Sequence, residues 1–189
     1  MKILTASLTF CFLMLSGGCA TIIDTFSSEP IQADPTERSM GTWMNDEKIE
    51  TIIAVNIRKA DPLFRQSRVK VVSFNRNVLL IGQVPSEHLL QLARTTAEQV
   101  GKVRTVYNQL TVGPITSLAT QSKDSWITTK IKAGLTSNKQ VSSDKISVTT
   151  ENGTVYLMGL VRPEQANETV QVAKETSGVK KVIKVFENI

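Results

Sequence analysis

Two short apolar stretches, each interrupted by a polar turn, dominate the pattern of hydrophobic and polar positions along the chain. Residues 148–159 read Val-Thr-Thr-Glu, then Asn152 and Gly153, then Thr-Val-Tyr-Leu-Met-Gly. Asn and Gly tolerate the positive φ angles that a tight hairpin turn requires, and β-branched and aromatic residues favour strands. The stretch therefore predicts two antiparallel strands joined by a tight turn.

The same pattern occurs 77 residues earlier, in residues 69–82. Asn75 aligns with Asn152, and Gly82 aligns with Gly159. Self-similarity at a fixed interval indicates that one structural unit occurs twice. We therefore expect a tandem repeat.

A helix is predicted ahead of each hairpin. Apolar residues recur there every four positions, as Ile49, Ile53 and Ile57 in the first repeat and as Ile127, Ile131 and Leu135 in the second. This spacing places them on one helix face. Asp46 and Asp124 stand at the expected helix starts, where an acidic side chain suits the positive end of the helix dipole.

A second helix and a third strand are predicted after each hairpin. A proline, Pro85 or Pro163, opens a segment free of internal Gly and Pro, and an apolar run ends each repeat. The order helix, strand, strand, helix, strand predicts an α+β fold of two small domains. In each, two helices cover one face of a three-stranded mixed sheet and leave the other face available for a partner.

The N-terminus has the features of a secretory signal. Lys2 precedes an apolar run of about 13 residues, which is short for a membrane span, and Ser16-Gly17-Gly18 leads to Cys19. Small residues before a cysteine favour a lipobox, with Cys19 as the site of lipid attachment. Ser16 stands where lipoboxes favour an aliphatic residue, and ordinary secretory cleavage after Ala20 is the alternative.

These observations predict the following organisation. Residues 1–18 are a signal peptide, 19–45 a lipidated N-terminus and tether, 46–112 the first domain, 113–123 a linker and 124–189 the second domain. Domains of this size lie near the lower limit for burying a self-sufficient core, so we expect each half to be stabilised by contact with its neighbour or with a partner.

The formal net charge of +5 is unevenly distributed. Residues 46–112 carry ten Lys or Arg against six Asp or Glu, residues 124–189 carry nine against seven, and residues 20–45 carry one against four. A basic surface suits nucleic acid or an anionic membrane, and an ordinary solvated surface is the alternative at so small an excess. Export argues against nucleic acid.

Few residues offer catalytic chemistry. His88 is the only histidine, and the glycines stand singly where turns and caps are expected, so neither a multi-histidine metal site nor a phosphate-binding glycine loop is indicated. We therefore predict a protein that is not an enzyme and has no metal, cofactor or small-molecule substrate.

Trp126 is the most informative candidate for a binding residue. It precedes the core residue Ile127 and shares a helix face with Lys130. A Trp and a Lys one turn apart suit the boundary between acyl chains and anionic headgroups. Packing of Trp126 against the first repeat or the linker is an equal alternative from the residues alone. Leu160 and Val161 either insert beside Trp126 or lie buried beneath the following helix.

The repeat unit resembles the BON domain, a small module of bacterial envelope proteins. The second copy carries the resemblance most fully, in Asp124-Ser-Trp-Ile-Thr-Thr-Lys-Ile, Val148-Thr-Thr-Glu-Asn-Gly, Tyr156-Leu-Met-Gly-Leu-Val161 and Ser177-Gly-Val-Lys-Lys-Val182. With Arg38-Ser-Met-Gly-Thr42, the chain is similar over nearly its whole length to outer-membrane lipoproteins with two BON domains.

The resemblance implies a lipid-anchored outer-membrane protein that faces the periplasm and is acylated, for example with palmitate, at Cys19. It also implies a second domain that binds anionic phospholipid, with Trp126, Ile127, Lys130, Leu160 and Val161 as candidate contacts. A role in outer-membrane integrity is expected, with division or outer-membrane assembly proteins as partners. The alternative function is a protein–protein adaptor that uses the open sheet face.

Overall fold

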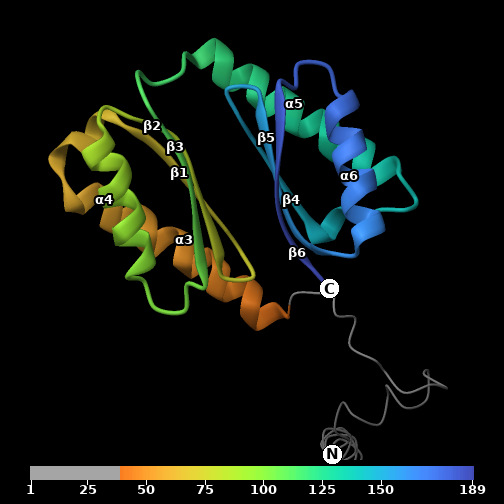
Figure 1. Ribbon diagram of the computed structural model, residues 1–189, viewed down its shortest axis with the longest axis horizontal. Coiled ribbons are helices and arrows are strands. Elements are labelled where there is room, and N and C mark those ends of the chain that lie inside the picture. Colours follow the sequence, from red (N-terminus) through yellow and green to blue (C-terminus); the bar gives the residue numbers. More distant parts are fainter. Residues whose placement is uncertain (1–38) are drawn as a thin grey trace, which may run out of the picture. The chain divides into compact units, whose positions relative to one another are not determined.

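The computed structural model describes residues 39–189, in which each repeat has the same order of elements (Figure 1). The first repeat contains α3 (Met40–Ala60), a short 3-10 helix η1 (Pro62–Gln66), β1 (Arg68–Phe74), β2 (Asn77–Val84), α4 (Glu87–Glu98) and β3 (Thr105–Val112). The second contains α5 (Leu118–Ser137), η2 (Ser143–Lys145), β4 (Ile146–Glu151), β5 (Thr154–Val161), α6 (Pro163–Glu175) and β6 (Lys181–Asn188). The predicted α+β fold of two repeats is confirmed.

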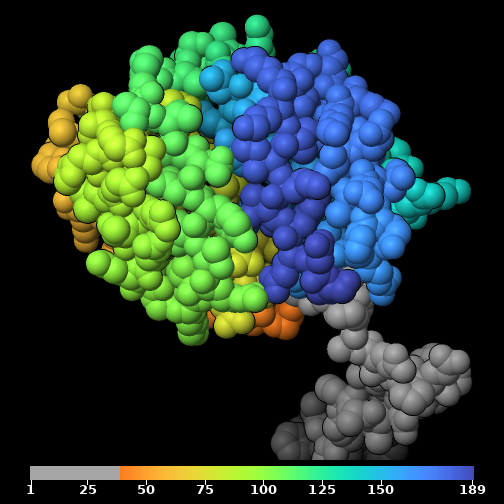
Figure 2. All heavy atoms as spheres, in the orientation of Figure 1, coloured from red at the N-terminus to blue at the C-terminus, as the bar shows by residue number. Residues whose placement is uncertain are grey.

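Each repeat forms a three-stranded mixed sheet with the hairpin at one side. The strand orders are β1-β2-β3 and β4-β5-β6, with an antiparallel first pair and a parallel second pair. The hairpin turns have positive φ at both central residues, 50° and 64° at Asn75 and Arg76, and 49° and 76° at Asn152 and Gly153. This is the backbone twist that a two-residue hairpin loop favours. Strand β6 is an edge strand, and it lies at the surface beside α6 (blue in Figure 2).

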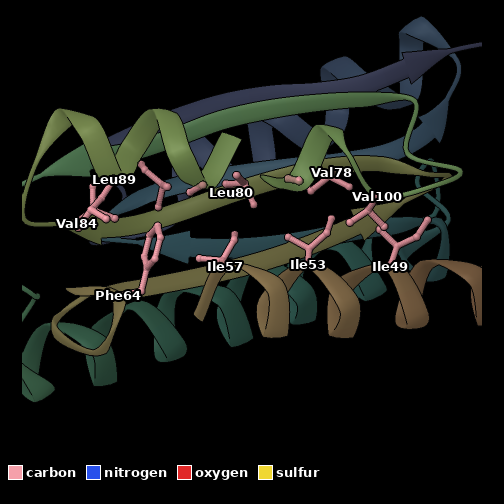
Figure 3. Packing of buried hydrophobic residues seen from close by; sticks show 12 residues of the cluster. Ile49, Ile53, Ile57, Phe64, Val78, Leu80, Val84, Leu89 and Val100 are labelled. Carbon is pink, nitrogen blue, oxygen red and sulfur yellow. The ribbon is translucent and has the colours of Figure 1, made fainter. Parts of the chain in front are cut away.

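The predicted helix series form the cores. In the first repeat, Ile49, Ile53 and Ile57 of α3 point towards Val78 and Leu80 of β2 (Figure 3). The second repeat has the equivalent cluster around Ile127, Ile131 and Leu135 of α5 with Val155 and Leu157 of β5. All of these side chains are buried. Each sheet thus has one face covered by its own two helices.

The prediction that the helices begin at Asp46 and Asp124 is wrong, because both aspartates lie inside longer helices and are buried. Asp46 accepts hydrogen bonds from the backbone N–H groups of Asn75 and Arg76, both at 2.8 Å. Asp124 accepts from the N–H groups of Asn152 (2.7 Å) and Gly153 (2.8 Å). Each carboxylate therefore ties a helix to the hairpin turn of its own repeat.

The helices instead begin at a Ser-x-x-Thr sequence that occurs in both repeats. Ser39 Oγ accepts from the Thr42 N–H at 3.1 Å, and Ser117 Oγ accepts from the Thr120 N–H at 3.2 Å. A serine at this position satisfies an N–H that has no partner within the helix. The end of the predicted tether and the second half of the predicted linker are therefore helical.

The sheet faces that we expected to be open are covered. Along a strand, side chains alternate between the two faces of the sheet. Residues that alternate with the core series form a third buried cluster, with Leu79 and Ile81 from the first repeat and Tyr156 and Met158 from the second. The two repeats therefore pack sheet against sheet, as the small size of each core suggested. The open sheet face that the adaptor alternative requires is buried in this contact.

Polar contacts between the two repeats accompany this third cluster. Glu151, 4% exposed, forms an ion pair with Lys70 (3.0 Å) and accepts hydrogen bonds from Arg68 (3.3 Å) and Gln83 (3.1 Å), all in the first repeat. Burial alone would raise the pKa of Glu151, but the contacts with Lys70 and Gln83 and the charge of Lys70 and Arg68 outweigh it and hold the pKa below its ordinary value. Glu151 is therefore ionised at neutral pH and links the two repeats.

Candidate functional site

Trp126 lies on the outer face of α5. Its side chain is 57% exposed, whereas the next residue, Ile127, is 4% exposed. One residue step turns a helix by about 100°, so neighbours in sequence face different directions. The alternative in which Trp126 is buried against the first repeat or the linker is therefore wrong, and an aromatic side chain of this size is left in contact with solvent.

Lys130 lies one turn after Trp126 and above its ring. The Nζ atom is 3.6 Å from the ring centroid, which is a cation–π contact. Both side chains are exposed. The pairing that the spacing predicted is therefore present, and it presents an aromatic ring and an ammonium group together on one helix face.

The rest of helix α5 carries positive charge and no exposed carboxylate. Lys123 and Lys132 are exposed in addition to Lys130. The helix has one acidic residue, Asp124, and its carboxylate is buried against the hairpin. Leu118, at the first helical position, is 80% exposed and stands eight residues before Trp126 on the same side. We call Leu118, Trp126 and Lys130 the α5 outer face.

The other three candidates do not reach this surface. Ile127 belongs to the core of the second repeat, as does Val161, which is 2% exposed. Leu160 is 7% exposed and belongs to the cluster between the two sheets. The structure thus brings Trp126 and Lys130 together at the surface and places the three aliphatic residues inside the protein.

Cys19, the predicted site of lipid attachment, lies outside the described residues, and no helix within 39–189 is long and apolar enough to cross a membrane. The same range contains no group of three His, Cys, Asp or Glu side chains placed to hold a metal ion. His88 is exposed in the first turn of α4. The α5 outer face is therefore the candidate site that stands out in the described part of the chain.

Comparison with known proteins identifies the repeat. The family model of the BON domain matches residues 45–114 and 123–187. The chain is 42% identical over 157 residues to the outer membrane lipoprotein DolP of Haemophilus influenzae, covering 83% of this chain and 80% of that protein. It is 40% identical over 152 residues to the 21 kDa hemolysin of Actinobacillus pleuropneumoniae, covering 80% of this chain and 78% of the relative.

A solved structure with some likeness is the C-terminal domain of CdsD, a structural protein of the type III secretion system of Chlamydia trachomatis. The identity is 15% and the TM-score is 0.30, with 76% of this chain and 67% of that chain covered.

Proposed function

The chain belongs to the family of BON-domain proteins, and from that premise we propose that it is a non-enzymatic outer-membrane lipoprotein whose second repeat binds anionic phospholipid. The protein is lipid-anchored in the outer membrane, and its folded repeats face the periplasm. The binding surface is the α5 outer face, with Trp126 in the interfacial region and Lys130 at the phosphates. Cys19 carries the acyl chains.

The observation that carries this proposal is the exposed Trp126–Lys130 pair on a helix with no exposed carboxylate. A Trp ring suits the depth at which acyl chains meet headgroups, and a Lys stem reaches from there to the phosphates. Each lysine close to an anionic surface contributes about 1 kcal/mol. The exposed Lys123 and Lys132 on the same helix add to this attraction.

The lipid anchor and the α5 outer face have different tasks in this proposal. A single acyl chain holds a protein weakly, and two or more hold it firmly. For a multiply acylated chain, contact through α5 selects the lipid type and the position in the membrane more than it supplies attachment. Such a protein supports outer-membrane integrity where anionic lipid is enriched, beside division or outer-membrane assembly proteins.

Lys130→Ala tests the electrostatic part of the proposal. We expect this change to weaken association of the chain from Ala20 onward with anionic vesicles about fivefold, because one interfacial lysine contributes about 1 kcal/mol. Co-sedimentation with anionic and zwitterionic vesicles measures the effect. Raising the salt concentration is expected to weaken wild-type binding.

Lys174→Ala is the matched control, because Lys174 is an exposed lysine in the last turn of α6. It is expected to bind anionic vesicles like the wild type. Equal losses of vesicle affinity in the two variants would mean that binding depends on net charge alone. No binding by the wild type would refute phospholipid binding by the folded repeats.

A further inference from the structure

Helix α3 of the first repeat carries an apolar surface that the core does not explain. The first six residues of α3, 40–45, include no buried residue. Three of them are large and apolar, with Met40 76%, Trp43 45% and Met44 49% exposed. In Figure 1 these turns, in orange, begin the described chain. Exposed apolar side chains that gather in this way mark contact surfaces.

The apolar surface continues along the helix. Ile52 is 46% exposed and borders the buried series that begins at Ile49, and Val55, 39% exposed, lies on the side opposite that series. Two shallow grooves border this side, and Lys48 and Ile52 line both of them. We call Met40, Trp43, Met44, Ile52 and Val55, with Lys48 among them, the α3 outer face.

The α3 outer face occupies the same place in its repeat as the α5 outer face. With the Ser-x-x-Thr caps aligned, Met40 is equivalent to Leu118, and Lys48 and Ile52 are equivalent to Trp126 and Lys130. Both helices therefore expose an apolar residue at the first position and a lysine beside an apolar side chain two to three turns later. In α3 the lysine precedes the apolar residue, whereas in α5 the lysine follows it.

We propose that the α3 outer face is a second membrane-binding surface, so that each repeat carries a surface for the phospholipid bilayer to which the chain is anchored. Because the two sheets pack face to face with the helices outside, the α3 and α5 outer faces lie on opposite sides of the folded part and contact the bilayer in turn. This inference rests on the proposed function, which supplies the acyl anchor at Cys19 and the phospholipid bilayer as the bound surface. It assigns to the first repeat a lipid contact of its own, made by Trp43, Met44 and their neighbours.

Chain length favours the membrane as the occupant. Twenty residues separate Cys19 from Met40. A fully extended chain of this length reaches about 70 Å, so an acyl anchor at Cys19 keeps the start of α3 within that distance of the bilayer. Tethering of this kind gives a weak surface contact a high effective concentration. A partner protein that is free in the periplasm has no such advantage.

Charge favours the same occupant. The exposed charged side chains of α3 are three cations, Lys48, Arg58 and Lys59, and one carboxylate, Glu47. The carboxylate of Glu50 accepts a hydrogen bond from the Ser73 N–H at 2.7 Å and so belongs to the contact with β1. Long basic side chains around an apolar strip suit anionic headgroups over acyl chains.

The two tryptophans of the chain supply one probe for each surface. In the Trp126→Phe variant the remaining Trp43 reports on α3, and in the Trp43→Phe variant Trp126 reports on α5. The full-length lipidated chain is reconstituted in anionic vesicles with and without brominated acyl chains, so that the anchor holds both variants at the bilayer. We expect Trp43 emission to shift to shorter wavelength in the vesicles and to lose intensity with brominated lipid.

A tryptophan elsewhere on the folded part provides the control. Gln91→Trp, in a chain with both natural tryptophans changed to Phe, places the probe on the exposed side of α4. This probe is expected to keep its emission with brominated lipid.

The outcomes separate the two proposals. Quenching of Trp126 without quenching of Trp43 overturns the second surface and leaves the proposed function in place, and the reverse result overturns the α5 site. A Trp43 emission that shifts with protein concentration in the absence of vesicles assigns the α3 outer face to a second copy and also overturns this inference.

A pair of variants tests the energetic contribution. Trp43→Ser with Met44→Ser, in the chain from Ala20 onward, is expected to weaken association with anionic vesicles about tenfold, or about 1.4 kcal/mol. Leu63→Ser removes an apolar side chain of similar exposure, 47%, from η1 and is expected to bind like the wild type. Unchanged binding by the double variant, with thermal unfolding like that of the wild type, would contradict the second surface.

Discussion

Asp124→Ala is expected to lower the free energy of unfolding by about 3 kcal/mol. The Asp124 carboxylate is 3% exposed and accepts hydrogen bonds from the backbone N–H groups of Asn152 (2.7 Å) and Gly153 (2.8 Å). Alanine leaves these two donors without the carboxylate, and an unsatisfied buried donor costs about 1–3 kcal/mol. For a chain of this size the melting temperature should fall by roughly 6–12 °C, measured by circular dichroism.

Asp144→Ala is the matched control for this prediction. Asp144 is an exposed aspartate in the short helix η2, and its loss is expected to change the free energy of unfolding by less than about 0.5 kcal/mol. Equal stability of the two variants would contradict the role of Asp124 as the link between α5 and the hairpin.

Ile81→Asp is expected to destabilise the protein by several kcal/mol through the contact between the two sheets. Ile81 is fully buried in the cluster that it shares with Tyr156 and Met158 of the other repeat. An unpaired carboxylate in such a place either remains charged at great cost or takes up a proton. Thermal unfolding should begin far below the wild-type transition.

Ile81→Val removes one methylene group from the same place and is expected to cost only about 1 kcal/mol. Wild-type stability of Ile81→Asp would contradict the packing of sheet on sheet. It would mean that this face of the first repeat is open to solvent, as the sequence pattern led us to expect.

The hairpins and the cores were predictable because their signals are local. The hairpin turn at Asn152 and Gly153 requires positive φ angles, which few other residues tolerate. The four-residue spacing from Ile49 to Ile57 defines one helix face without reference to the rest of the chain. The repeat then predicted the second copy of each element from the first.

The helix starts were missed because two residue types compete for the same role. An aspartate ahead of an apolar series resembles a cap, and the sequence does not reveal that Asp46 bonds to the backbone at Asn75, 29 positions later. The Ser-x-x-Thr pairs at Ser39 and Ser117 were the signal that was overlooked. A search for capping serines upstream of each aspartate would have found both starts.

The covered sheet face could not be predicted from the strands alone. In β5, Tyr156 and Met158 alternate with Val155 and Leu157, so both faces are apolar and periodicity does not distinguish a solvent face from a second buried one. For the same reason Leu160 and Val161 qualified equally as surface or core. Trp126 and Lys130 were identified correctly as a pair because helical spacing alone brings them together.

The most direct test of the central claim compares Trp126→Ala with Tyr107→Ala in binding to anionic vesicles. Tyr107 is an aromatic side chain on β3 with 38% exposure and lies outside both proposed surfaces. Insertion of about half of the Trp126 ring area is worth about 2 kcal/mol, or roughly thirtyfold in affinity.

We therefore predict that Trp126→Ala, with unchanged thermal unfolding, binds anionic vesicles roughly thirtyfold more weakly than the wild type, whereas Tyr107→Ala binds like the wild type. Wild-type binding by folded Trp126→Ala, or an equal loss in both variants, would contradict the claim that the α5 outer face binds phospholipid.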